Sequence, residues 1–219
     1  MNKLLLKFLT GHCVLEKSHS SINGTIEVQE DLFNQKSLMV GGISQSGKRV
    51  EEVWSKGLKK LKNLKTKKLK NILILGLGAG TLAGLLSKLY PGVKIVGVEI
   101  DSEMIRLGKK YFKLDKNKNL EIKIADALET INDKQSLSLR DQQLTINNYD
   151  LVLVDIYVGD QVPERVESDL FLGKIKELKS PVIFNRLYYG KKKEKTEEFS
   201  QKLKKFFTKI EAKKIGVNK

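Results

Sequence analysis

The sequence contains little cysteine, histidine and proline, and this scarcity excludes several kinds of protein. Its 219 residues include one cysteine, two histidines and three prolines. The single cysteine, Cys13, cannot form an internal disulfide and stands far from any cluster with the spacing of metal ligands. A metal or nucleophile site formed by Cys13 and His12 is the weaker interpretation, and a strand or turn near the N-terminus is the stronger one. We therefore expect no metal site.

Long hydrophobic runs are missing as well. The longest uncharged apolar stretch, residues 71–87, contains four glycines and is followed by Lys88, so it is poorly suited to cross a bilayer. Near the start, the apolar residues 4–9 are broken by Lys7, and His12 stands where a lipoprotein-type cleavage site needs a small residue. We predict no signal peptide and no membrane association, and we expect a cytoplasmic location.

Aromatic residues make up only 7% of the chain, but this does not indicate disorder. Hydrophobic residues amount to 40%, and runs of Leu, Ile and Val recur between residues 71 and 187. A chain of this length with this much apolar material can bury one core. We expect one globular domain with a small appendage.

Arginine is scarce among the basic residues, since it provides five of 41. The net charge of +15 comes from residues 56–70, with eight lysines and no acids, and residues 191–219, with eleven lysines and four glutamates. Such faces can attract nucleic acid, but phosphate recognition favours arginine and interleaved aromatic residues. We favour solvated lysine faces over a nucleic-acid site, because apolar residues recur at helical spacing beside the first run: Val50, Val53, Trp54, Leu58 and Leu61.

Short strands alternate with helices along most of the chain. Alternating stretches at residues 24–28 and 37–40 predict a small β-hairpin element within residues 1–50. Buried strands are then predicted at 72–75, 93–98, 120–124, 151–154 and 182–184. Helices are predicted at 81–90, at 102–112 with Ser102 as N-cap, near 164–178 and at 191–207. Residues 51–219 therefore predict a Rossmann-like α/β fold, a mostly parallel doubly wound sheet with helices on both faces.

Two stretches interrupt or follow this alternation. Residues 132–148 are rich in Gln, Ser, Asn and Asp, which predicts a surface insertion. Residues 209–215 have the pattern of one further strand. A doubly wound sheet of this type often continues into yet another strand, so either this sheet is shorter or the chain is truncated.

A glycine turn joins the first predicted parallel strand to its helix. It reads Gly76-Leu77-Gly78-Ala79-Gly80 and is followed by Thr81. Glycines allow a tight turn and a close approach of backbone to ligand, and the N–H groups of the helix start favour a negative group. Thr81 replaces the third glycine of a dinucleotide turn, and the Gly-Lys-Ser/Thr of a nucleoside triphosphate loop is absent. The turn thus predicts a nucleotide-like ligand other than NAD or ATP.

Acidic residues follow the next three strands. Glu99, beside Ile100, follows the second strand, Asp126-Ala127 the third, and Asp155 the fourth. Glu99 lies 23 residues beyond the start of the glycine turn, near the separation expected for an acid that accepts hydrogen bonds from ribose hydroxyls. The alternative is that these acids cap helices or turns. Because the carboxyl ends of parallel strands meet at one edge, three acids beside a glycine turn favour a binding site.

These motifs resemble the S-adenosylmethionine-dependent methyltransferase fold and, more closely, its spermidine synthase (polyamine aminopropyltransferase) branch. The likeness to the branch rests on residues 38–45, Leu-Met-Val-Gly-Gly-Ile-Ser-Gln, which lead to Glu51 and Trp54. The resemblance implies a transferase, a homodimer, and S-adenosylmethionine or its decarboxylated form as cofactor. Gln45 and Glu99 would contact the ribose or the methionine-derived part, Asp126 with Ala127 the adenine, and Asp155 the reaction centre. The implied cofactor site comprises Gln45, Gly76, Gly78, Ala79, Gly80, Glu99, Ile100, Asp126, Ala127 and Asp155.

The sequence departs from the branch at three places. Ala79 replaces an acid that attracts the amine of the decarboxylated cofactor, Ser55-Lys56 replace two polar active-site residues, and Val158 replaces the usual catalytic acid. Without the acid at position 79, the helix start at Thr81 favours the carboxylate of intact S-adenosylmethionine. We therefore favour methyl transfer to an unknown acceptor. The alternatives are a divergent aminopropyltransferase and a degenerate scaffold protein whose lysine-rich ends contact an acidic partner.

Candidate catalytic residues follow the fourth strand. Asp155 or Asp160 is expected to hold or deprotonate a small-molecule acceptor such as an amine, and Tyr157 to pack against the sulfonium through a cation–π contact. Asp160 lies two residues beyond Val158 and is the candidate to replace the missing acid. The alternative is that Asp160 caps a loop and Tyr157 fills the core.

Overall fold

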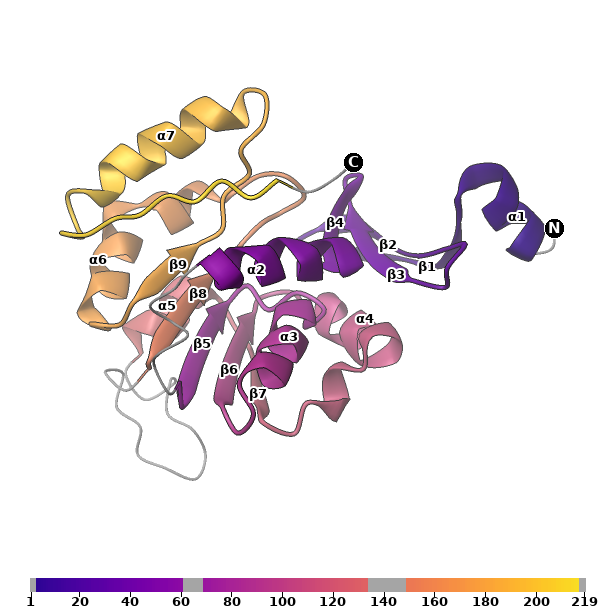
Figure 1. The fold of residues 1–219 in the computed structure, drawn as a ribbon, viewed down its shortest axis with the longest axis horizontal. Helices are drawn as coiled ribbons and strands as arrows, with labels where there is room; N and C mark the ends of the chain where they lie inside the picture. The colour runs from indigo at the N-terminus through magenta and orange to yellow at the C-terminus, as the bar shows by residue number, and fades with distance from the viewer. Residues whose placement is uncertain (1–2, 61–68, 134–148, 217–219) are drawn as a thin grey trace.

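The N-terminal part of the chain forms an antiparallel sheet. A computed structural model describes residues 3–60, 69–133 and 149–216. A short helix precedes four strands in the order β1-β2-β3-β4 (Figure 1). Their bounds are α1 (Lys3–Thr10), β1 (His12–Ser20), β2 (Gly24–Asp31), β3 (Lys36–Val40) and β4 (Ile43–Gly47). The hairpin expected from the sequence is β2–β3, and the appendage is a larger sheet than predicted.

The two additional strands lack a regular alternation of apolar and polar residues. The register of β1 against β2 shifts between Val14 and Glu16, which interrupts the period of two. Strand β4 reads Ile-Ser-Gln-Ser-Gly and contains one large apolar residue. Cys13 is buried within β1, in agreement with the strand interpretation.

The remainder of the chain forms a five-stranded parallel sheet in the order β7-β6-β5-β8-β9. Its strands are β5 (Asn71–Leu75), β6 (Lys94–Glu99), β7 (Leu120–Ile124), β8 (Leu151–Val154) and β9 (Val182–Phe184). All five predicted strands are confirmed, and so is the Rossmann-like fold class. The chain runs outward from β5 to β7 and then returns to β8 on the other side. This reversal creates a switch point between β5 and β8, where open α/β sheets bind ligands.

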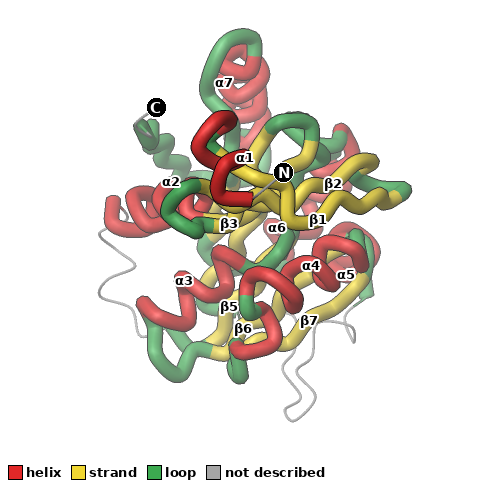
Figure 2. Tube along the Cα trace, turned by 90° about the vertical axis from the view of Figure 1, so that its right-hand side faces the viewer, coloured by secondary structure: helices red, strands yellow, loops and turns green. Residues whose placement is uncertain are grey.

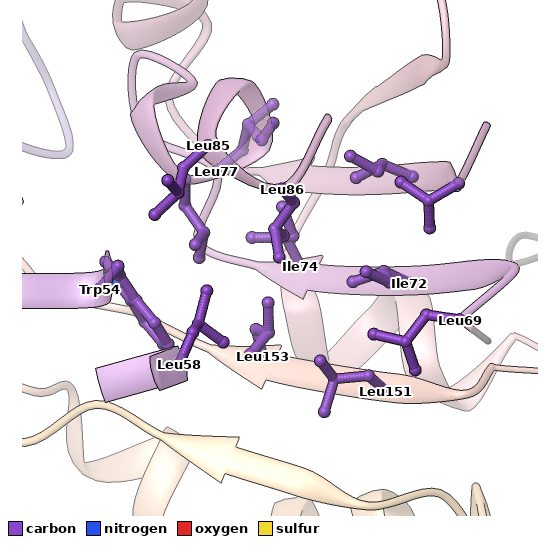
Figure 3. Packing of buried hydrophobic residues seen from close by; sticks show 14 of the residues in the cluster. Trp54, Leu58, Leu69, Ile72, Ile74, Leu77, Leu85, Leu86, Leu151 and Leu153 are labelled. Carbon is purple, nitrogen blue, oxygen red and sulfur yellow. The ribbon is translucent and has the colours of Figure 1, made fainter. Parts of the chain in front are cut away.

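Helices cover both faces of the parallel sheet (Figure 1). They are α2 (Lys48–Lys60), α3 (Thr81–Leu89), α4 (Ser102–Phe112), α5 (Ala127–Asn132), α6 (Asp169–Glu177) and α7 (Lys192–Leu203). Ile72 and Ile74 of β5 pack with α2 and α3 on one face, as Figure 3 shows. The intervening Leu73 and Leu75 pack with α5, α6 and α7 on the other. Both faces are apolar, which explains the continuous hydrophobic runs in the sequence.

Several predicted boundaries are wrong for local reasons. Asp101, rather than Ser102, caps α4, because its side chain accepts a hydrogen bond from the Glu103 N–H. The helix expected near 164–178 is divided by Ser168, which caps α6 after a short 3-10 helix. Residues 209–215 form no strand. The surface insertion predicted at 132–148 lies outside the described residues from 134 onward, as do residues 61–68 of the lysine-rich run.

The N-terminal sheet docks on α4 and on the glycine turn (Figure 2). The shared apolar cluster contains Ile26, Val28, Leu38, Val40, Ala79, Met104 and Leu107. At its border Glu16 accepts hydrogen bonds from Arg106, Lys110 and Tyr111 of α4. This docking places β4 beside the carboxyl edge of the parallel sheet. In the described part of the chain, no helix combines the length and hydrophobicity needed to cross a membrane.

Candidate active site

A cavity that opens to solvent lies at the carboxyl edge of the parallel sheet. The ends of β5, β6, β7 and β8 contribute to its wall, and β4 contributes from the N-terminal sheet. Nine predicted site residues line it: Gln45, Gly76, Gly78, Glu99, Ile100, Asp126, Ala127, Asp155 and Tyr157. The structure does not place the other three predicted residues, Ala79, Gly80 and Asp160, among its lining residues.

The glycine turn brings two strand ends together. Gly76 has φ +89°, and a Cβ built there would lie 2.3 Å from the Asp155 carbonyl oxygen. Any side chain at position 76 would therefore collide with the end of β8. Gly80 serves packing instead, because a Cβ there would lie 2.2 Å from Leu114 Cδ1.

Ala79 is buried in the cluster beneath the N-terminal sheet, and its N–H donates to Ser46 Oγ at 3.1 Å. Ala79 and Gly80 thus hold the turn in place and do not line the cavity, and their predicted contact with the cofactor stays a prediction.

The N–H groups of the turn already have protein partners. Gly76 and Leu77 both donate to the Val98 carbonyl oxygen at 3.0 Å, and Gly78 donates to Glu99 Oε2 at 2.7 Å. These groups are therefore not directed at a ligand. Binding of a negative group by this region would depend on the first turn of α3, where Thr81 and Leu82 line the cavity.

Glu99 ends β6 and connects the turn to the next loop. Its Oε2 accepts from the Gly78 N–H, and its Oε1 accepts from the Asp101 N–H at 3.0 Å. Burial raises the pKa of the Glu99 carboxyl, and these two hydrogen bonds oppose that rise. The side chain is 8% exposed and borders the cavity.

Next to Glu99, the cavity wall combines apolar and acidic groups. Ile100 is 42% exposed although it is apolar, and it faces the cavity together with Ala127 and Leu128. Asp126 accepts the Leu128 N–H at Oδ1 as the cap of α5, and its Oδ2 pairs with Arg165 at 3.0 Å. Asp126 thus caps α5, as the capping interpretation expects, and it also lines the cavity; its role in binding stays a prediction. We call Glu99, Ile100 and Asp126 the β6–β7 end of the cavity.

Asp155 is held by two residues that the sequence did not mark as part of a site. The indole Nε1 of Trp54 donates to Asp155 Oδ2 at 2.8 Å, and the amide Nδ2 of Asn185 donates to Oδ1 at 2.9 Å. Burial raises the pKa of the Asp155 carboxyl, whereas both hydrogen bonds lower it. Asn185 follows β9, so the rule that polar residues follow strand ends could have found it. We call Trp54, Asp155 and Asn185 the β8–β9 end of the cavity.

Tyr157 and Gln45 fix the loop that follows β8. The Tyr157 hydroxyl donates to the Asn185 carbonyl oxygen at 2.9 Å and accepts the Leu187 N–H at 3.1 Å. Burial raises the pKa of this hydroxyl, so the ring stays neutral. Gln45 Nε2 donates to the Gly159 carbonyl oxygen at 2.7 Å, which links β4 to the same loop.

Asp160 is directed elsewhere. Its carboxylate pairs with Lys192 at 3.0 Å and accepts from the Gln161 amide at 2.7 Å. It borders a second cavity, which shares Tyr157 and Leu187 with the first. The Asp160 carboxylate thus does not line the main cavity, and its role as the replacement for the acid missing at Val158 stays a prediction.

The apolar and acidic residues that line the cavity fit a nucleoside cofactor with a cationic tail. The β6–β7 end offers an exposed apolar side chain beside two carboxylates, which suits a flat base and a ribose. The β8–β9 end offers a third carboxylate at the switch point, where a positive group can be held. The roles of the individual residues in binding stay predictions.

Comparison with known proteins identifies a family for most of the chain. Residues 51–213 match the spermine/spermidine synthase domain. A polyamine aminopropyltransferase of Vibrio vulnificus (strain CMCP6) is 32% identical over 109 residues, which cover 50% of this chain and 34% of that protein. A Drosophila melanogaster homologue of eEF1A lysine and N-terminal methyltransferase is 29% identical over 118 residues, 51% of this chain and 16% of that protein. The matches thus span about a third or less of these relatives, both of which are named as transferases.

Solved structures show the same fold. Spermidine synthase from Thermotoga maritima superposes with a TM-score of 0.66 at 19% identity, covering 89% of this chain and 64% of that one. Human methyltransferase-like protein 13, solved with SAH, gives a TM-score of 0.55 at 21% identity, covering 74% of each chain. At these identities the superpositions support the fold alone. The domain match extends over more than half of the sequence, and the chain therefore belongs to the spermine/spermidine synthase family.

Proposed function

We propose that this chain binds S-adenosylmethionine in the cavity and transfers its methyl group to a small-molecule acceptor such as an amine. One observation carries the choice of methyl over aminopropyl transfer. Each of the three carboxylates among the described lining residues already accepts a protein hydrogen bond or ion pair at both oxygens. Each oxygen keeps about one further acceptor site, enough for ribose hydroxyls. Asp126 is already neutralised by Arg165, however, and the several positive charges of a diamine and the decarboxylated cofactor exceed the two carboxylates that remain, Glu99 and Asp155.

Two of the departures from the branch support the same choice. Ala79 is buried against the N-terminal sheet, so it offers no carboxylate to an amine. Val158 is 37% exposed and apolar, so no acid stands where the family's catalytic acid would be. When bound, S-adenosylmethionine supplies an electrophilic methyl group on a positive sulfur.

The residues of the chain then have separable tasks. Glu99 accepts hydrogen bonds from the ribose, Ile100 and Ala127 contact the base, and Asp155 holds positive charge near the switch point. Gln45 keeps the loop after β8 over the cavity through its bond to Gly159. The acceptor amine must lose a proton before its nitrogen attacks the methyl group. That proton passes to water or to another group of the acceptor molecule.

Calorimetric titration tests this proposal. The purified chain is titrated at fixed salt with S-adenosylmethionine, decarboxylated S-adenosylmethionine and methylthioadenosine. We expect the intact cofactor to bind most tightly, and Glu177→Gln, at an exposed helix end, to bind as the unaltered chain does. Tighter binding of the decarboxylated form would overturn the proposal.

The second candidate function is aminopropyl transfer, because one relative is named as a polyamine aminopropyltransferase. The nucleoside product separates the two reactions. Methyl transfer from the intact cofactor leaves S-adenosylhomocysteine, and aminopropyl transfer from the decarboxylated form leaves methylthioadenosine. Incubation with each cofactor and a panel of amines, followed by chromatography, identifies the product. Failure to bind any of the three ligands would support a scaffold protein that has lost this chemistry.

A further inference from the structure

The surroundings of Asp155 indicate more than its place at a strand end. Asp155 follows β8 at the switch point and lies beside Gly76, near the centre of the sheet edge. The two hydrogen bonds that its carboxylate accepts come from two elements far apart in the sequence. Trp54 reaches it from α2, on one face of the sheet, and Asn185 reaches it from the end of β9.

Both bonds favour a charged carboxylate in one fixed orientation. An indole N–H donates and has no acceptor, and the Asn185 amide presents its NH₂ group. A proton on either Asp155 oxygen would weaken or displace one of these bonds. Trp54 itself is 4% exposed and packed in the apolar cluster of Figure 3, so its N–H has little freedom to turn away.

The negative charge at this end has no positive partner in the cavity wall. Arg165 is the one basic side chain among the described lining residues, and it pairs with Asp126 at the β6–β7 end. Tyr157 lies next to Asp155 but its hydroxyl is bonded to backbone groups of Asn185 and Leu187. A partly buried anion held by donors and lacking a cation is an incomplete ion pair, which a cationic ligand would complete.

We propose that Trp54 and Asn185 are positioning residues that hold Asp155 as a fixed anionic receptor for the positive sulfur of the cofactor. This inference rests on the proposed function. It gives the cavity a means to distinguish S-adenosylmethionine from S-adenosylhomocysteine, whose sulfur is neutral. The product is then bound more weakly than the cofactor and leaves the site readily.

Paired titrations test the inference. We measure the dissociation constants of S-adenosylmethionine and S-adenosylhomocysteine for the unaltered chain, Trp54→Phe, Asn185→Leu and Leu58→Ala. In the first two variants the preference for the cationic ligand should fall by about fivefold to tenfold, because one hydrogen bond to a charged group is lost. Leu58→Ala removes packing one helical turn from Trp54 and should leave the preference unchanged.

The outcomes separate this inference from the function on which it rests. A chain that binds neither ligand overturns both. A chain that binds both ligands equally, or keeps its preference in both Trp54→Phe and Asn185→Leu, overturns the inference alone. An equal fall in Leu58→Ala also overturns it, since packing would then explain the effect. If Trp54→Phe does not fold, Asn185→Leu decides, because Asn185 lies in a loop outside the apolar cluster.

Discussion

The two ends of the cavity are built in different ways. At the β6–β7 end, Glu99 and Asp126 bond to groups within three residues or to the neighbouring turn, apart from the pair with Arg165. At the β8–β9 end, Asp155 depends on Trp54, 101 positions earlier, and on Asn185, 30 positions later. The first end follows from local motifs, whereas the second is assembled by the fold.

This difference bears on how the family can change its chemistry. The β6–β7 end has the acids that the resemblance implies for nucleoside binding. Of the departures, Val158 lies in the loop that follows Asp155 and Ser55-Lys56 follow Trp54 on α2, so both lie next to the β8–β9 end, whereas Ala79 lies beneath the N-terminal sheet. A cofactor can therefore be retained at one end while the other end is altered to suit a different transfer.

Gly76 joins the two ends, so Gly76→Ala should have the largest effect. The added Cβ would meet the Asp155 carbonyl oxygen, and φ +89° is unfavourable for alanine. We expect unfolding in urea to show a loss of about 3 kcal/mol, and binding of all adenosyl ligands to disappear. Gly84→Ala is the matched control, because a Cβ there meets nothing within 4 Å and should stabilise α3 by roughly 0.5 kcal/mol. Unchanged stability in Gly76→Ala would contradict the close approach of β5 and β8.

Glu99→Gln should affect the β6–β7 end alone. Both oxygens of Glu99 accept backbone N–H groups, so an NH₂ group in place of one oxygen faces a donor. We expect calorimetry to show that the affinities for S-adenosylmethionine, S-adenosylhomocysteine and methylthioadenosine all fall by one common factor of about 30. Weakening of the cationic ligand only would assign Glu99 to charge recognition and remove the distinction between the ends.

The same contrast explains what the sequence could predict. The five parallel strands are apolar runs buried on both faces, and the acids that follow β6, β7 and β8 meet at one edge whatever the helices between them do. The helical spacing predicts that Trp54 is a core residue of an amphipathic helix, and this is confirmed, but its N–H also donates to Asp155. The periodicity of apolar residues does not reveal a hydrogen bond between segments that are distant in the sequence. Strand β4 was not predicted because its polar residues have partners in the glycine turn and in the loop after β8 rather than an apolar face.

Lowering the pH should reduce the affinity for a cationic ligand more than the affinity for an uncharged one, because only the cationic ligand depends on the charge at the β8–β9 end. Burial raises the pKa of Asp155 above its ordinary value of 3.8. Protonation removes the negative charge, so affinity for S-adenosylmethionine should fall by about tenfold as the pH decreases through this raised pKa. The sulfur of methylthioadenosine is uncharged. The affinity for this ligand should therefore fall only as far as protonation of Glu99 weakens binding. Equal pH profiles for the two ligands would mean that Asp155 does not sense the charge of the ligand.

Asp160→Asn should have the smallest effect, although Asp160 is only five positions from Asp155. Lys192 lowers the pKa of Asp160, which is therefore charged at neutral pH, but this charge is paired outside the main cavity. An exposed pair of this kind contributes little, so affinity for S-adenosylmethionine and release of S-adenosylhomocysteine should stay within about twofold. Asp155→Asn, measured in parallel, should lose most of its preference for the cationic ligand. If Asp160→Asn lost turnover instead, the loop after β8 would have to turn this acid inward during the reaction, and Asp160 would then replace the acid missing at Val158.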